Sequence, residues 1–547
     1  MSPRQHTTSP NIFFENTKMT STCPNNRLTL SSTPSMTDQY SAPPTGHQTF
    51  LPYYPILTSA CLTATYLSLI LTLNITLHAV TQTNPDALAI AHALDEENAA
   101  GICRGLLHGV PLLLKDNIVT LDGMDTTCGS LALVGARPEK EANVIGVLRR
   151  AGAVILGKGN MAEWAGFRST SGDSGWSATG GQSTGIYYPG MKASGSSGGC
   201  GVAVGAGMAF AALGTETCYS ITSSAEKSGI IGFKPTRDLI SSQGIIHASK
   251  RLDTVGILAR TLPDIIRVLL GLIPESTHIP SPMRQKLVHD LSPTCSSMRL
   301  DGMRLGIPAF LPPLSACKTQ AFTKVLRVLQ SAGATIIYNI SMPGVQACES
   351  LPQAAKNSML YTEMKSAINT YLSFLVINPQ NIHTLSDLIA FTTTHPDEAY
   401  PQRNVAGLEA ALATDPEDAL YKTMLAKEEY WIGEGGITVT LNRHQCDVLI
   451  LPNLNVTLQT FAAKAGSQVC RVPMGVFPVG TNVEVEKGNG LVGQAPGIPV
   501  SAYIFGRATK DEDVLKVGYV VERGLRVREV LVPFFETSTG VELFSGM

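Results

Sequence analysis

Residues 170–199 read TSGDSGWSATGGQSTGIYYPGMKASGSSGG, and Gly and Ser fill 16 of these 30 positions. A Gly/Ser run of this density is typical of a flexible linker. Here, however, Trp176, Tyr187 and Tyr188 lie inside the run, and apolar segments flank it on both sides. Because glycine lets backbone amides approach a ligand closely, the segment predicts a functional loop inside a folded core.

The segments around this loop alternate between helical and strand-like patterns. Short apolar runs predict buried strands, and longer amphipathic or small-residue runs predict helices. Alternation of this kind is typical of an α/β fold with helices on the faces of the sheet. The predicted strands are 110–114, 153–156 and 448–451, and the predicted helices are 87–94, 142–151 and 201–213.

The composition of the whole chain narrows the classes of function. Its 547 residues include 41 Lys and Arg against 43 Asp and Glu, so the net charge is −2. This balance excludes a broad basic surface, and no nucleic-acid partner is expected. Hydrophobic residues make up 44% and charged residues 15%, which excludes global disorder. The 11 cysteines include no C-x-x-C and the 11 histidines no H-E-x-x-H, so neither a metal nor a cofactor is expected.

Residues 1–50 differ in composition from the rest of the chain. Ser, Thr and Pro occupy 23 of these 50 positions, and only five residues are charged. So little apolar surface predicts a disordered polar extension without a catalytic role. No apolar run follows a basic start, so we expect no signal peptide and a cytoplasmic location.

Residues 51–80 contain no charged residue and resemble a membrane span by hydropathy alone. Polar residues interrupt the run, however, and apolar residues recur at spacings of three and four. That pattern predicts a helix with one apolar stripe, packed on a protein core. We therefore expect no membrane insertion, and a membrane anchor is the alternative. The stripe comprises Leu62, Tyr66, Leu69, Ile70, Leu73 and Leu77.

Two well-known sequence motifs are matched in residue type, but the residues around them do not fit. Gly181–Gly185 and Gly195–Gly199 match G-x-S-x-G, but neither directly follows the buried strand that a nucleophile elbow requires. Gly152–Lys158 matches most of the phosphate-binding loop, but Gly159 stands where that motif requires Ser or Thr. Neither an α/β-hydrolase triad nor a phosphate-binding loop is therefore predicted.

A more informative set of residues consists of one lysine and three serines. Lys115 ends the apolar run that begins at Val110, and a lysine there is costly to bury unless it is paired or neutral. The tandem serines Ser196 and Ser197 stand between glycines, and Ser220 follows Ser196 by 24 residues, within GTETCYSI. A serine hydroxyl becomes a good nucleophile when a base takes its proton, and a desolvated lysine can be that base.

With these motifs the sequence resembles the amidase-signature hydrolases, and most of all the fungal amidases. The resemblance is dense over 109–262 and implies an amidase-signature fold, in which a mixed central β-sheet is covered by helices on both faces. It implies one amidase domain over 51–547, with a largely helical insert at about 270–445. Further matches at family spacing are Asp125-Thr-Thr, Glu163-Trp164, Ser174-Gly-Trp-Ser177, Gly229–Thr236, Asp253-Thr-Val-Gly256 and Phe505-Gly-Arg507.

The resemblance also implies a Ser–cis-Ser–Lys triad. By motif position Ser220 is the nucleophile, Ser196 the bridging serine and Lys115 the terminal base, with a cis peptide bond before Ser196. The expected reaction is hydrolysis of a small-molecule carboxylic amide through an acyl-enzyme, which needs no metal and no cofactor.

The segment before the nucleophile is expected to stabilise the oxyanion. By the same resemblance, the backbone N–H groups of Thr217, Cys218, Tyr219 and Ser220 are the candidate donors. Ser197 is a further candidate for substrate binding.

The main departure from the family lies in this segment. Members usually carry Gly directly before the nucleophile, where this chain has Tyr219, and often a second Gly at the position of Cys218. A positive φ at Tyr219 would cost about 1–2 kcal/mol, and without it the ring still lies near the acyl pocket. We therefore expect an active enzyme that is slow or narrow in scope. The alternatives are a catalytically impaired amidase-like binding protein, a membrane-associated lipid-amide hydrolase and a glutamyl-amide transferase subunit.

Overall fold

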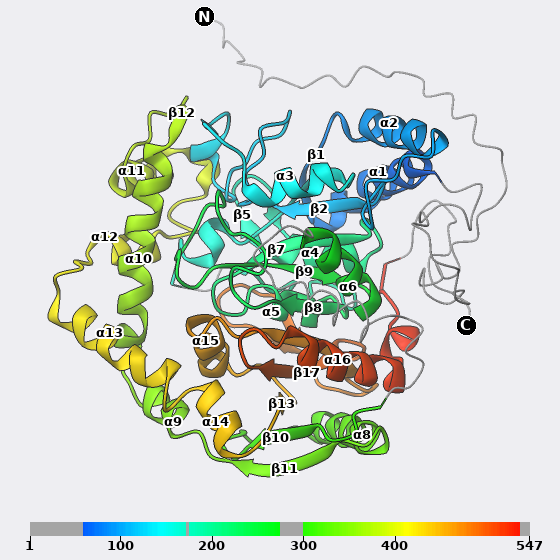
Figure 1. The fold of residues 1–547 in the computed structure, drawn as a ribbon. Coiled ribbons are helices and arrows are strands. Elements are labelled where there is room, and N and C mark those ends of the chain that lie inside the picture. Colours follow the sequence, from blue (N-terminus) through cyan, green and yellow to red (C-terminus); the bar gives the residue numbers. More distant parts are fainter. Residues whose placement is uncertain (1–57, 171–173, 274–298, 536–547) are drawn as a thin grey trace, which may run out of the picture.

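A computed structural model describes residues 58–170, 174–273 and 299–535. Eleven strands form one mixed sheet through the middle of the molecule (Figure 1). The α/β fold class and the mixed central sheet are therefore confirmed. In sheet order the strands are β1 (Val80–Thr83), β4 (Val154–Gly159), β2 (Pro111–Lys115), β7 (Ala211–Glu216), β9 (Thr254–Ala259), β8 (Ile231–Lys234), β14 (Val469–Val476), β17 (Pro499–Gly506), β13 (Val448–Leu451), β10 (Arg304–Pro308) and β11 (Thr335–Ile340).

Helices cover both faces of this sheet, as the alternation of side chains along β17 demonstrates. Val500 and Ile504 belong to a core cluster that includes Val517 of α16. Tyr503 and Phe505, which alternate with them, belong to a second cluster with Phe461 of α15. The described α-helices outside residues 341–446 are α1 (Ser59–Leu77), α2 (Ala87–Ala99), α3 (Asn143–Arg150), α4 (Gly198–Gly205), α5 (Thr222–Lys227), α6 (Leu262–Leu272), α8 (Ala316–Ser331), α15 (Val456–Lys464) and α16 (Asp511–Leu525).

β2 shows why the site forms where it does. The strand reads PLLLK, all five of its residues are buried, and it pairs in parallel with both β4 and β7. Such a position favours a continuous apolar run, which confirms the strand predicted over 110–114. The predicted strands 153–156 and 448–451 are confirmed as β4 and β13, and β4 contains Gly157 and Lys158 of the false phosphate-loop match.

The helix predicted over 201–213 is wrong in its second half. The helix α4 covers Gly198–Gly205, and residues 211–216 form the central strand β7. A run of small apolar residues has no polar positions to mark its period, so its helical and strand portions look alike in sequence. The other two predicted helices are confirmed as α2 and α3.

The uncharged segment after residue 57 forms the predicted helix α1, which packs against α2. The side chain of Thr58 caps its first turn, and the helix ends at His78, which has a φ of 49°. Tyr66, Ile70, Leu73 and Leu77 of the predicted stripe are buried. Among the described residues α1 is the one helix long and apolar enough to cross a membrane, and 33% of its most apolar window is buried in the protein.

The region 270–445 is helical only in part. β10 and β11 extend the central sheet, so the helical portion begins after residue 340. It forms a layer at one side of the molecule, drawn in light green and yellow in Figure 1. Its elements are α9 (Pro343–Glu349), α10 (Gln353–Ser373), β12 (Leu375–Ile377), α11 (Leu385–Thr394), α12 (Ala406–Leu412), α13 (Ala419–Ile432) and α14 (Ile437–Arg443).

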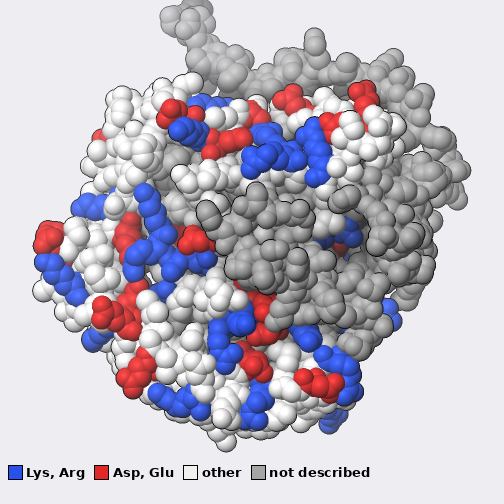
Figure 2. Space-filling view, in the orientation of Figure 1, with Lys and Arg blue, Asp and Glu red and all other residues white. Residues whose placement is uncertain are grey.

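Short two-stranded pairs complete the fold. β12 pairs with β3 (Arg137–Pro138), β5 (Trp176–Ser177) with β6 (Gly181–Gln182), and β15 (Glu484–Val485) with β16 (Val492–Gln494). Basic and acidic side chains are interspersed on the face drawn in Figure 2, in keeping with the net charge of −2. Residues 1–50 lie outside the described residues, so the predicted extension stays a prediction.

Candidate active site

The three residues expected to form a triad lie in one hydrogen-bond chain. The Nζ of Lys115 donates to the Oγ of Ser196 over 2.8 Å, and that Oγ donates to the Oγ of Ser220 over 2.9 Å. Lys115 ends β2, Ser196 precedes α4, and Ser220 follows β7. Lys115 and Ser196 are 81 residues apart in the sequence, and Ser196 and Ser220 are 24 apart. The three residues therefore meet at the end of two adjacent strands.

The surroundings of Lys115 suit a base. Its side chain is fully buried, and its Nζ also donates to the Oγ1 and the carbonyl O of Thr215, over 2.8 and 2.9 Å. Burial lowers the pKa of Lys115 from 10.5 to about 8. A lysine with that pKa is neutral often enough near pH 8 to accept a proton.

Thr215 was not among the predicted site residues. Its Oγ1 also accepts a hydrogen bond from the Nδ2 of Asn117, which follows Lys115 by two positions. The sequence gives one signal for it, because Thr215 lies in the same GTET segment that leads to Ser220.

The loop that contains Ser196 and Ser197, which we call the serine loop, is held against the segment that carries Ser220. The Gly195–Ser196 peptide bond is cis, as the resemblance implies. The backbone N–H of Ser197 donates to the carbonyl O of Ser220, and the Oγ of Ser223 donates to the carbonyl O of Gly195. The predicted site residue Ser197 uses its Oγ to donate to the carbonyl O of Thr215, so it supports the loop from within.

Gly199, the second glycine after the tandem serines, lies where the backbone leaves no room for a side chain. A Cβ there would lie 2.3 Å from the carbonyl O of Ala79 and 2.6 Å from the backbone N of Asn160. Atoms do not approach so closely without displacement, so a side chain at this position would push α4 away from β1 and β4. The glycine is required by close packing under the serine loop.

Residues 217–220 form a turn between β7 and α5, which we call the oxyanion turn. None of the four backbone N–H groups has a hydrogen-bond acceptor among the residues that the structure describes. Consecutive unpaired N–H groups form a concave donor site for an anion. The nearby carboxylate of Glu216 does not contact these N–H groups. It accepts from the N–H groups of Ile221 and Thr222 and so caps the start of α5.

The two residues that depart from the family pattern are not strained. Neither Cys218 nor Tyr219 is among the described non-glycine residues with positive φ, so the first explanation considered for Tyr219 does not hold. Both side chains are partly buried. Burial raises the pKa of the Cys218 thiol to about 11, so the thiol stays protonated at neutral pH and is a poor nucleophile.

A second buried charge lies beside the triad. Asp116, next to Lys115, accepts hydrogen bonds from Thr127 and Gly129, and burial raises its pKa to about 6. The fully buried Lys158 donates to Thr126 and to the carbonyl O of Ile118. These contacts fix the 126–129 loop beside the strand that carries the candidate base.

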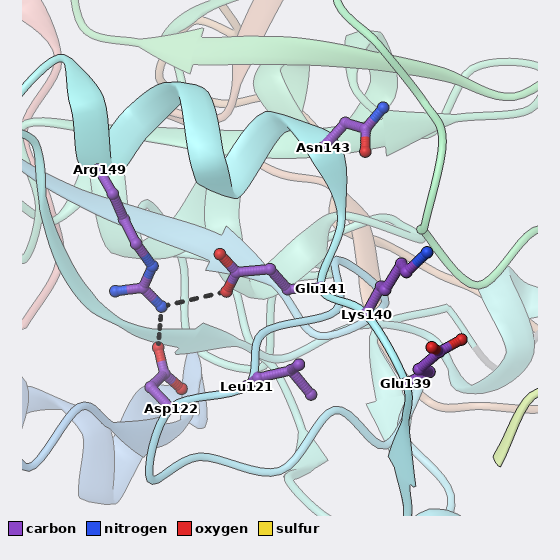
Figure 3. Close-up of a pocket in the computed structure, with 7 residues that line it drawn as sticks. All are labelled: Leu121, Asp122, Glu139, Lys140, Glu141, Asn143 and Arg149. Carbon is purple, nitrogen blue, oxygen red and sulfur yellow. Dashed lines mark hydrogen bonds and ion pairs between the residues drawn. The ribbon is translucent and has the colours of Figure 1, made fainter. Parts of the chain in front are cut away.

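A hollow on the surface lies apart from this chemistry. Arg149, one of its lining residues, pairs with Asp122 and Glu141 (Figure 3). Leu121, Glu139, Lys140 and Asn143 complete its lining, and no member of the candidate triad takes part. Within the described ranges, no group of three or more His, Cys, Asp or Glu side chains is arranged to hold a metal ion.

Comparisons with known proteins identify the family of this chain. The sequence profile described as Amidase matches residues 61–515. The chain belongs to the amidase family. A relative named as an amidase in Arthroderma benhamiae is 37% identical over 492 residues, 87% of this chain and 81% of that protein. A glutamyl-tRNA(Gln) amidotransferase protein of Oleidesulfovibrio alaskensis is 28% identical over 82% of this chain and 90% of its own.

Solved structures give the same result. The peptide amidase of Stenotrophomonas maltophilia is similar with a TM-score of 0.74 and 33% identity, over 88% of this chain and 96% of that one. An amidase family protein from Bacillus anthracis is similar with a TM-score of 0.72 and 26% identity, over 87% of this chain and 89% of that one. The protein is therefore an amidase-family hydrolase with the amidase-signature fold.

Proposed function

We propose that this protein hydrolyses small carboxylic amides through an acyl-enzyme on Ser220. The observation that carries the proposal is the unbroken chain of hydrogen bonds from Lys115 through Ser196 to Ser220. A nucleophile, a bridging hydroxyl and a base of lowered pKa are the parts that serine-dependent amide hydrolysis requires.

In the acylation step the Oγ of Ser220 attacks the carbonyl carbon of the amide. Its proton passes to the Oγ of Ser196, whose own proton passes to the neutral amine of Lys115. The carbonyl oxygen becomes an oxyanion, which accepts hydrogen bonds from the N–H groups of the oxyanion turn. A single donor of this kind contributes about 3–4 kcal/mol to catalysis, so the turn is central to the rate.

The tetrahedral intermediate then breaks down along the same route. The ammonium of Lys115 gives a proton to Ser196, and Ser196 gives one to the nitrogen of the leaving amine as the C–N bond breaks. Water attacks the ester on Ser220 with the same base, which releases the acid and restores the hydroxyl. The products are a carboxylic acid and an amine or ammonia.

The deciding experiment is active-site labelling of the full chain with a fluorophosphonate, followed by mapping of the modified residue. We expect the label on Ser220, and we expect Ser220→Ala to lose both the label and turnover with an unchanged melting temperature. Ser358→Ala, on α10, is the matched control and should retain both. An unlabelled protein without turnover would instead favour the amidase-like binding protein.

The substrate class needs a panel. Because the Stenotrophomonas maltophilia relative is a peptide amidase, peptide carboxamides belong in the panel beside small aryl and alkyl amides. Glutamine tests the amidotransferase-like alternative, since a protein of that kind must release ammonia from it. Turnover of glutamine alone would contradict the proposed general amidase.

A further inference from the structure

The oxyanion turn must be held in place without its own N–H groups. All four N–H groups of residues 217–220 lack an acceptor in the described part of the chain, which leaves them available to substrate. The contacts that fix the turn therefore run through carbonyl oxygens and side chains. At its end near α5, the Oγ of Ser224 and the N–H of Ser197 donate to the carbonyl O of Ser220.

At its other end the side chain of Thr217 anchors the turn. The Oγ1 of Thr217 donates to the Oδ1 of Asp253 over 2.6 Å, and both residues are buried. A hydrogen bond to an ionised carboxylate is stronger than one between neutral groups, so this contact strongly restricts where Thr217 lies.

Asp253 is itself fixed from several directions. Its Oδ2 accepts from the backbone N–H groups of Ala248 and Ser249, over 2.7 and 3.1 Å, and lies 3.2 Å from the Nδ1 of His247. The same loop is tied to the helical layer, because the Oγ of Ser249 donates to the carboxylate of Glu363 on α10. A carboxylate held by this many donors has little freedom to follow a displaced threonine.

We propose that Asp253 is a positioning residue that holds the oxyanion turn through the hydroxyl of Thr217. Asp253 does not touch the reacting atoms. It sets the direction of the N–H groups toward the developing oxyanion, and small errors in that direction cost rate because the donors act only in the transition state. This role rests on the proposed function of the turn in amide hydrolysis.

The test compares two substitutions at Thr217 with one control substitution at a similar hydrogen bond elsewhere in the protein. Thr217→Val removes the hydroxyl with little change of shape, and Thr217→Ser keeps the hydroxyl. The control is Thr236→Val, because the Oγ1 of Thr236 donates to the Oδ2 of Asp511 over 2.6 Å at the start of α16. The two bonds have the same chemistry and length, but the control bond does not hold the turn.

We expect Thr217→Val to lower kcat at least tenfold with KM changed less than twofold. Thr217→Ser should restore kcat to within threefold of the parent, and Asp253→Asn should lower kcat as much as Thr217→Val. Thr236→Val should lower the melting temperature about as much as Thr217→Val does, but without lowering kcat. Because Thr217 carries no charge, the midpoint of the pH profile of Thr217→Val should stay near the parental value.

The outcomes separate this proposal from the proposed function. If the parent neither turns over amides nor takes the fluorophosphonate on Ser220, the proposed function is wrong and the positioning role falls with it. If the parent is active but Thr217→Val keeps its kcat, or Thr217→Ser is as impaired as Thr217→Val, the positioning role alone is overturned. A melting temperature lowered at Thr217 with kcat intact would likewise leave Asp253 a purely structural residue.

Discussion

Lys115 determines how the proposed activity depends on pH. Full burial lowers its pKa to about 8, and the mechanism requires its neutral form. Below that pH the ammonium dominates, so kcat/KM should fall about tenfold per pH unit, and above it kcat/KM should level off. The measurement is the initial rate from pH 6 to pH 9.5 at constant ionic strength.

The matched variant is Lys115→Met, which keeps an unbranched side chain of nearly the same length without a base. It should lose turnover across the whole pH range while the melting temperature shows that it is folded. A rate that stays flat between pH 6 and pH 9 in the parent would contradict a lysine base with this pKa.

Cys218 and Tyr219 bear on the scope of the enzyme. Since neither residue has a positive φ, relief of strain no longer predicts a faster enzyme after Cys218→Gly, Tyr219→Gly. Removal of a partly buried ring beside the nucleophile should instead widen the range of accepted acyl groups. We expect kcat/KM for bulky amides to rise about tenfold, roughly 1.4 kcal/mol of barrier, with small amides little affected.

The comparison is made on a series of amides with increasing acyl size. Equal changes along the whole series would point away from steric exclusion. The single variants Cys218→Gly and Tyr219→Gly assign the effect, and we expect it to follow the larger side chain.

The sequence predicted which three residues lie together in the candidate triad, but not the residues that contact them. Lys115, Ser196 and Ser220 stand in motifs whose residue types and order are informative. Thr215 and Asp253 act through contacts that only the folded sheet creates, since Asp253 reaches the turn across the β7–β9 pair. The motifs around Thr215 and Asp253 are visible in the sequence, but their contacts are not.

Among the elements, the helical layer is joined to the core by a buried ion cluster. Arg168 donates to the carboxylates of Glu163 and Glu398, over 2.7 and 2.6 Å, and all three side chains are buried. Burial raises the pKa of Glu163 well above its usual range, and the nearby Glu398 adds to that effect. Glu398 also accepts from the Oγ of Ser130, so the cluster links the layer to the loop beside the triad.

Arg168→Met should therefore destabilise the protein strongly. It leaves two carboxylates buried without their cation, for which we expect a loss of about 3–5 kcal/mol in the free energy of unfolding. Denaturant titration of the variant and the parent measures this difference in the free energy of unfolding. Arg299→Met, which breaks the exposed pair with Asp301, is the control and should change stability little. A loss no larger than that of the control would mean that the cluster holds nothing together.

The elements that sequence patterns predicted best were those with a clear period or with a uniformly apolar core. β2 and α1 belong to this group. The error at 201–213 has the opposite cause, because Gly and Ala favour neither a polar face nor a period. Tertiary context decided the boundary there, and β7 became a strand because it pairs with β2 and β9.

At the scale of the whole molecule, the polar N-terminal segment should be dispensable. Residues 2–50 offer little apolar surface to bury, so their deletion should leave the melting temperature and kcat/KM within error. The measurement compares the full chain with the truncated one by thermal unfolding and by the amide assay. A drop of several degrees would show that the segment packs on the domain.

The pairing of β2 with β7 has a consequence for how such enzymes diversify. The strand that ends in Lys115 and the strand that leads to Ser220 are direct neighbours in the sheet, so a spacing of about 4.8 Å between their backbones is inherited from the ladder. A graft that exchanges the helical layer between residues 341 and 446 does not change this spacing between β2 and β7. The graft has to supply acids for Arg251, which pairs with Glu363 and Glu428 of the layer, and for the buried Arg168, which pairs with Glu398.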